Sequence, residues 1–202
     1  MHVESIRKNA LLIAMSIVVL SAFILLFLVI CFSLVPIKSE NIGLLVGLSI
    51  PTIISMWLFP MFCTYILRIK TDIKQCRKGI LISCLWMILF ITIYCLLYSG
   101  EFESEINMMV IIGHYIIVSI GEEFTYRRVV LDILNTRYAS GISILLSAVM
   151  FSFILHLNEN ILVNIAIRFP IGIVLGYIAT KTRTISYTVL LHTIYNLLVF
   201  II

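Results

Sequence analysis

Long apolar runs separated by short polar turns dominate the chain from end to end. Seven windows are apolar enough to be read as transmembrane helices. They are residues 10–35, 42–67, 79–99, 105–135, 141–157, 161–180 and 185–202. Strands of a membrane barrel would instead alternate polar and apolar residues over shorter segments. The pattern therefore predicts an all-α fold, a polytopic membrane helical bundle of about seven transmembrane helices, with no internal repeat.

Two local features refine this picture. Prolines inside predicted helices are expected to kink them, Pro51 and Pro60 in the second and Pro170 in the sixth. The first run follows Arg7 and Lys8, as a signal peptide would. It is longer than the apolar region of a signal peptide, about 7–15 residues, and lacks a small-residue cleavage pattern. We expect it to be a retained anchor.

Composition supports the bilayer as the solvent. The chain is 62% hydrophobic and only 12% charged, whereas about a quarter of a soluble domain is charged. One integral membrane domain is the natural reading. No basic stripe is interleaved with aromatic residues, so a nucleic-acid partner has no support. The five cysteines form no C-x-x-C pair and mostly lie in apolar runs, which indicates free thiols rather than a disulfide framework.

Basic residues predict the orientation of the helices. Most lie before the first window or in alternate turns: Arg7, Lys8, Arg68, Lys70, Lys74, Arg77, Lys78, Arg128, Arg137, Lys181 and Arg183. The other turns carry only Lys38 and several glutamates. Because basic loops stay in the cytoplasm, we expect a multi-pass cell-membrane protein with a cytoplasmic N-terminus and an outside C-terminus.

Ionisable side chains divide the chain into two parts. The first three windows contain no Asp, Glu, Lys, Arg or His. The last four contain His114, Glu122, Glu123, Arg127, Asp132, His156, Arg168 and His192. A charge in mid-membrane costs about 2.5–3.5 kcal/mol on insertion scales and usually marks a site or a conduction path. We therefore divide the chain into three N-terminal spans (residues 1–104) and a functional core of four spans (residues 105–202).

The densest polar motif is Gly-Glu-Glu-Phe-Thr-Tyr-Arg at residues 121–127. On a helix, Glu123 and Arg127 share a face in the favourable order for an ion pair. Glu122 points about 100° away and has no evident partner in its own helix, which suits a general base. The alternative is that both glutamates belong to an interfacial charged turn.

Two further motifs contain histidine. His156 stands near the end of the fifth window, where a lone histidine is more often a packing residue than a catalyst. His192 and Asn196, four residues apart, share a helix face and could donate hydrogen bonds to an oxyanion or simply bond between helices.

The depths of these residues along their helices can be compared. Measured from the turn near residues 136–140, Glu122 lies about 20 Å along its helix and His156 about 24 Å along the adjacent one. His192 lies only about 10 Å from the start of its own helix. A raised loop, a tilt or a broken helix must bring His192 to the others.

Taken in order, Glu-Glu-x-x-x-Arg, a distal His and His-x-x-x-Asn resemble the CPBP family of intramembrane peptidases, from about residue 106 onward. That family includes type II CAAX prenyl endopeptidases and bacteriocin-processing and immunity proteins of the Abi group. The resemblance implies that Glu122 and His156 activate water, that His192 and Asn196 stabilise the oxyanion, and that Glu123 and Arg127 support them. One departure is Ser152, because the family usually has Phe four residues before the middle histidine.

We therefore expect an intramembrane endopeptidase that hydrolyses a membrane-associated or small peptide near the cytoplasmic side of the bilayer. No cofactor is expected, and zinc is not favoured because His-Glu-x-x-His is absent, although two histidines and a carboxylate could hold it. Two alternatives remain. One is a non-catalytic immunity or regulatory protein of the same fold. The other is a transporter, for which inverted repeats would be expected.

Overall fold

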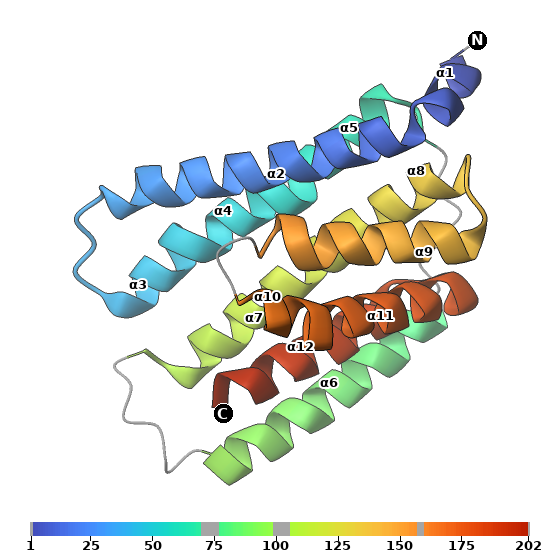
Figure 1. Ribbon diagram of the computed structural model, residues 1–202. Helices are drawn as coiled ribbons and strands as arrows, with labels where there is room; N and C mark the ends of the chain where they lie inside the picture. The colour runs from blue at the N-terminus through green and yellow to red at the C-terminus, as the bar shows by residue number, and fades with distance from the viewer. Residues whose placement is uncertain (1, 70–76, 99–105, 157–159, 202) are drawn as a thin grey trace.

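The computed structural model describes residues 2–69, 77–98, 106–156 and 160–201, and all the regular structure in these ranges is helical (Figure 1). Helices that follow one another without a break form continuous rods. The N-terminal part consists of α1 (His2–Lys8), α2 (Ala10–Ser33), the rod α3 (Glu40–Leu44), η1 (Leu45–Ser49), α4 (Ile50–Ile53), η2 (Ile54–Leu58) and α5 (Phe59–Ile66), and then α6 (Arg77–Tyr98).

The C-terminal part is built in the same way. Its members are the rod α7 (Met108–Glu123), η3 (Phe124–Val130) and α8 (Leu131–Asn135), the rod α9 (Ser140–Val149) and η4 (Met150–Ile154), the rod α10 (Ile161–Val163), η5 (Asn164–Arg168) and α11 (Phe169–Thr182), and finally α12 (Ser186–Ile201). Within the described ranges, five rods or helices are long and apolar enough to cross a membrane, and α9–η4 and α12 are shorter apolar helices. The predicted all-α polytopic bundle is thus confirmed.

The segments named η have π-helical hydrogen bonding, and three of them have a common cause. In η1, η2 and η5 the widened turn ends two residues before Pro51, Pro60 and Pro170. Proline has no N–H to bond to the carbonyl four residues earlier, so the preceding turn bonds across five residues instead. The prolines therefore act on the predicted helices by widening a turn. No proline accompanies η3 and η4, which carry residues of the candidate site.

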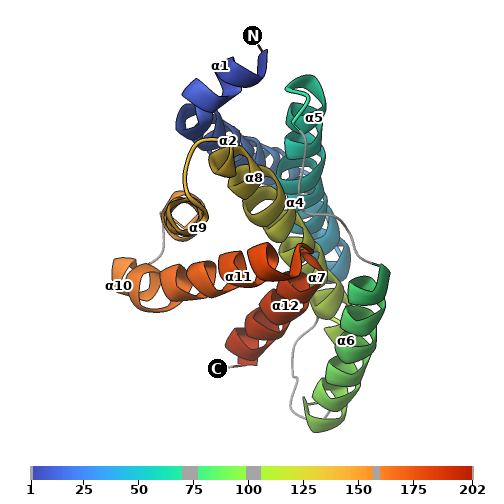
Figure 2. The same ribbon diagram turned by 90° about the vertical axis from the view of Figure 1, so that its right-hand side faces the viewer.

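The α7–α8 rod lies at the centre of the packing. Helix α2 packs along its second half, where Ala10, Ala14 and Val18 contact a fully buried surface that includes Val130 and Leu134. The α3–α5 rod packs on α7, and α12 packs on the other side of α7, with α6 outside α12 (Figure 2). The N-terminal spans therefore contribute to the packing around the functional core, because α2 and the α3–α5 rod contact the α7–α8 rod directly.

Small residues allow close helix contacts in the C-terminal part. Gly172 and Gly176 of α11 face α9, where an added Cβ at Gly172 would lie 3.1 Å from the Cβ of Ala148 and 3.3 Å from Phe151. Gly121 makes a similar approach to Met56 in η2. Glycines spaced four apart let two helix backbones approach closely in a membrane. Helix α9 is thereby fixed against α11 at the level of Phe151.

The two ends of the bundle differ in charge. At one end Arg137 donates a hydrogen bond to the carbonyl of Lys8, and Leu67 packs in the same cluster as Leu134. Figure 1 shows the turn between α11 and α12 at this end as well, and Arg183 caps the end of α11 in that turn. At the opposite end the backbone N–H of Asn107 donates to Asn41, 2.7 Å away. The turns that carry the basic residues thus gather at one end, which we refer to as the basic end.

Candidate active site

The Glu-Glu motif lies at the junction of α7 and η3, in the middle of the central rod. Glu123 and Arg127 are fully buried, and Oε2 of Glu123 lies 3.4 Å from Nε of Arg127. Arg127 also donates to the hydroxyl of Ser147 on α9, 3.3 Å away, and Ser147 in turn donates to the carbonyl of Tyr126. The ion pair expected from the spacing is present, and Ser147 provides a hydrogen-bond acceptor for Arg127 from the neighbouring helix.

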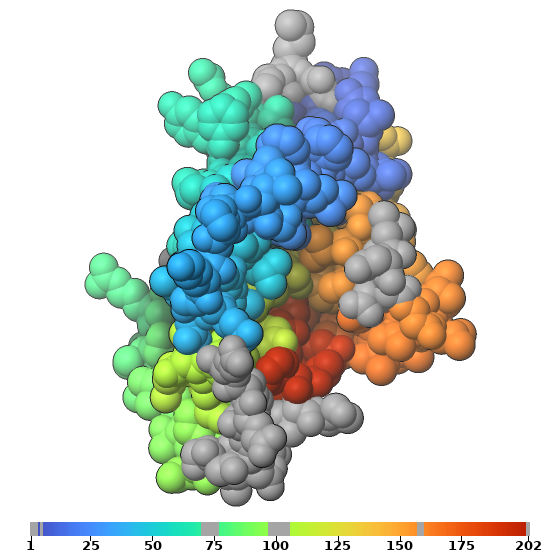
Figure 3. All heavy atoms as spheres, turned by 90° about the vertical axis from the view of Figure 1, so that its left-hand side faces the viewer, coloured from blue at the N-terminus to red at the C-terminus, as the bar shows by residue number. Residues whose placement is uncertain are grey.

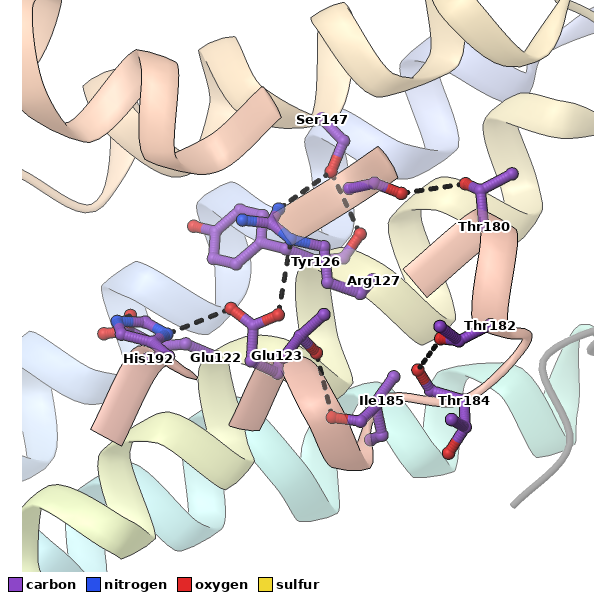
Figure 4. Close-up of polar contacts among 12 residues, drawn as sticks. Glu122, Glu123, Tyr126, Arg127, Ser147, Thr180, Thr182, Thr184, Ile185 and His192 are labelled. Atoms are coloured by element: carbon purple, nitrogen blue, oxygen red, sulfur yellow. Dashed lines mark hydrogen bonds and ion pairs between the residues drawn. The ribbon is translucent and has the colours of Figure 1, made fainter. Parts of the chain in front are cut away.

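His192 of α12 lies between the two glutamates. Its Nδ1 is 3.0 Å from Oε1 of Glu123, and its Nε2 is 3.5 Å from Oε2 of Glu122. The shorter contact fixes the orientation of the imidazole, and the other ring nitrogen then faces Glu122 (Figure 4). One oxygen of Glu123 thus faces Arg127, and the other accepts from His192. The sequence spacing predicts only the first of these contacts.

The way in which α12 crosses the central rod brings His192 to this depth. Arg183, which ends α11, has a left-handed backbone conformation with φ of 52°. Ile185, just before α12, packs in one cluster with Ala179 and Phe124. The α11–α12 turn lies at the basic end, but α12 crosses the central rod obliquely (Figure 2), so its start contacts the rod at Phe124 and not at its end at Asn135. This crossing closes the depth difference of His192 noted from the sequence.

Phe151 separates the two histidines. Its ring meets the ring of His192 edge to face at a centroid distance of 5.6 Å and that of His156 at 6.0 Å. The Arg127 guanidinium lies 4.9 Å from the centroid of the same phenyl ring. Phe151 comes five residues before His156, not four, and it lies in the π-helical stretch η4. Because π-helical bonding joins residues five apart, the widened turn accounts for Phe151 taking the place expected of residue 152.

Ser152 itself has a different role. Its side chain is fully buried, and its hydroxyl donates to the carbonyl of Ala148 in its own helix. The departure from the family pattern at this position is therefore compensated locally, since an aromatic ring still lies beside the middle histidine.

A cavity of about 500 Å³ joins these groups. The four residues predicted to be catalytic all line it, namely Glu122, His156, His192 and Asn196. Asn196 donates a long hydrogen bond, 3.4 Å, to the hydroxyl of Ser119 on α7. Glu123 and Arg127 lie behind the cavity wall and do not line it. The structure therefore brings the four residues to one cavity and separates them from the two predicted to support them.

Further polar groups for which no role was predicted lie in or beside the cavity. Arg168 lines it and donates to Asn164 at 2.8 Å, and Asn164 donates to the backbone carbonyl of His156 at 2.9 Å. His114 also lines the cavity, with Nδ1 2.9 Å from the hydroxyl of Ser49. Arg168 and His114 were visible as charges in apolar windows, whereas Asn164 and Ser49 gave no signal in the sequence.

No group of three or more His, Cys, Asp or Glu side chains is arranged to hold a metal ion in residues 2–69, 77–98, 106–156 and 160–201. The donors nearest to such a group are Glu122, Glu123 and His192, but both ring nitrogens of His192 already face carboxylates. The four cysteines in these ranges are free thiols, and Cys76 lies outside them.

Comparison with known families gave one match. A family model described as type II CAAX prenyl endopeptidase Rce1-like matches residues 104–198. The matched range contains all three motifs and every predicted site residue from Glu122 to Asn196. This match confirms the resemblance to the CPBP family in the C-terminal part of the chain. Comparisons with curated proteins and with solved structures gave no match.

Proposed function

We propose that this chain, whose residues 104–198 match a type II CAAX prenyl endopeptidase model, is an intramembrane endopeptidase that hydrolyses a membrane-associated or small peptide. The single observation that carries the proposal is the position of Glu122. Its carboxyl group lines a cavity shared with two histidines and an asparagine, while the adjacent Glu123 is bound on both oxygens. The two neighbouring glutamates are therefore suited to different tasks.

Glu122 is the proposed general base. Peptide hydrolysis in an apolar environment needs a fixed group that takes a proton from water as the water attacks the carbonyl carbon. A water molecule in the cavity can reach Glu122 and His156 from the same space, since both side chains line it. We propose that these two residues activate the water and that no metal ion is required.

His192 and Asn196 are the proposed oxyanion donors. Preorganised donors stabilise the negative charge that develops on the carbonyl oxygen in the transition state. Both residues lie on one face of α12 and line the cavity. The contact with Glu123 holds the ring of His192 in place, and the hydroxyl of Ser119 does the same for the amide of Asn196. Glu123 and Arg127 are proposed to support the site by position and not to touch the substrate.

The test is cleavage of a quenched peptide library by the purified protein in detergent, comparing wild type with Glu122→Gln. Loss of the general base is expected to lower the rate by about 10²–10⁴-fold. Glu4→Gln is the matched control, because Glu4 is an exposed glutamate on α1. A Glu122→Gln protein that cleaves at the wild-type rate would refute the mechanism. If wild type cleaves nothing, the non-catalytic immunity or regulatory role becomes the better explanation.

A further inference from the structure

The cavity is not symmetric about Glu122 along the central rod. Glu122 stands fourteen residues after Met108, the start of α7, and thirteen before Asn135, the end of α8, so it lies about 20 Å from either end of the rod. The residues of α7 that line the cavity, His114, Tyr115 and Val118, all come before Glu122. None of the cavity-lining residues of this rod comes after it.

The rod is closed on the other side of Glu122. From Glu123 to Leu134, nine side chains are fully buried among α2, the α3–α5 rod and α9. They are Glu123, Thr125, Tyr126, Arg127, Val129, Val130, Leu131, Ile133 and Leu134. No rod residue after Glu122 lines the cavity, and packing of this density leaves no path for water or peptide along the rod toward the basic end, because protein interiors have few voids as large as a water molecule.

The other residues that line the cavity also lie toward the end opposite the basic turns. Val199 and Phe200 belong to the final turn of α12, and Arg168 ends η5, which follows the short α10. Figure 3 looks at this end of the molecule and shows the end of α12 set back between α7 and the α10–η5 segment. The cavity is thus a well with its floor at Glu122, Phe151 and His192, and its mouth lies at the end opposite the basic turns.

The charges at the two ends give the well a direction. Arg7, Lys8, Arg68 and Arg137 gather at the closed end, and basic turns of this kind remain in the cytoplasm. We propose that the well opens to the non-cytoplasmic side of the membrane, so that its substrate is a polypeptide that has already been exported or a membrane-anchored chain whose cleaved segment lies outside. The identity of this substrate class rests on the proposed peptidase function. The direction also differs from the cytoplasmic side expected from the sequence, and it requires a translocation reaction to supply the substrate.

Thiol accessibility tests the direction without relying on activity. In a background with all five native cysteines replaced, Val118→Cys places a thiol in the wall of the well, one turn before Glu122. A membrane-impermeant thiol reagent is applied to right-side-out and to inside-out vesicles prepared from the same cells. If the proposal is correct, the reagent modifies Val118→Cys in right-side-out vesicles and does not modify it in inside-out vesicles.

Two control positions set the scale. Ser140→Cys, at the start of α9 on the basic end, is expected to react only in inside-out vesicles. Leu85→Cys, on the exposed face of α6, is expected to face lipid and to react in neither. Modification of Val118→Cys only in inside-out vesicles overturns the proposed direction. Failure of this thiol to react in both preparations and in detergent overturns the open well.

The same experiment separates the two proposals. If the protein cleaves peptides but its Val118→Cys thiol reacts only in inside-out vesicles, the peptidase function is supported and the proposed direction of the well is refuted. If this thiol reacts from the outside but Glu122→Gln leaves the cleavage rate unchanged, the direction of the well is supported and the proposed mechanism is refuted.

Discussion

Nδ1 of His192 lies 3.0 Å from a carboxylate oxygen of Glu123, although 69 residues separate them in the sequence. Because the other oxygen of Glu123 faces Arg127, a single buried carboxylate joins an ion pair within the central rod to a histidine of α12. This arrangement ties the stability of the bundle to the orientation of a proposed catalytic ring.

Glu123→Gln is expected to destabilise the protein and to lower its activity. The substitution leaves the Arg127 charge buried beside a neutral amide, and removing one partner of a buried ion pair costs about 3–5 kcal/mol. Thermal unfolding in detergent measures the first effect and peptide cleavage the second.

A double variant separates these effects. Glu123→Leu combined with Arg127→Met removes both charges, so most of the stability is expected to return while activity stays low because His192 has lost its partner. A Glu123→Gln protein as stable as wild type but unable to turn over would mean that the roles assigned to Glu122 and Glu123 must be exchanged.

Phe151→Leu is expected to lower kcat, because the rings of His156 and His192 both pack against this phenyl group. Ser152→Ala is the matched control in the adjacent position. The Ser152 hydroxyl bonds only to a carbonyl of its own helix, so its loss should cost about 1 kcal/mol or less and leave kcat unchanged. The reverse ranking of the two variants would contradict the five-residue spacing that we ascribe to η4.

Gly172→Ala is expected to destabilise the contact between α9 and α11. The new methyl group would lie 3.2 Å from the backbone of Ala148 and 3.3 Å from Phe151, and overpacking of this kind typically costs about 1–3 kcal/mol. Gly113→Ala in α7 is the control, since no atom lies within 4 Å of its added methyl group. Alanine there should stabilise the helix by up to about 1 kcal/mol. Equal melting temperatures for the two variants would contradict close packing at Gly172.

Chelation is expected to leave peptide cleavage unchanged. Both nitrogens of His192 face carboxylates within 3.5 Å, and no three His, Cys, Asp or Glu side chains in the described ranges are arranged to hold a metal ion, whereas a catalytic zinc site typically has three protein ligands. The measurement is the cleavage rate after prolonged treatment with a strong chelator. Loss of activity that added zinc restores would show that His192 leaves at least one of these carboxylates to bind the metal.

The sequence predicted those features that depend on spacing along one helix. Seven apolar windows and the pair Glu123–Arg127 follow from length and from a separation of four residues. The contacts of His192 could not be predicted in this way, because they depend on the packing of Ile185 on Phe124, which determines where α12 crosses the central rod. The position of Phe151 was missed for a related reason, since no proline in the sequence marks the widened turn of η4.

The bond between Glu123 and His192 also has a consequence for how the protein is made. Helix α7 leaves the ribosome well before α12, so for an interval the nascent chain holds Glu122, Glu123 and Arg127 without the histidine that lies between the two carboxylates. An unpaired charge is costly in the bilayer, so the central rod is expected to remain near the insertion machinery until α12 arrives. The site would then be completed only at a late step of biogenesis, and the growing chain would be unable to cleave its neighbours before it is assembled.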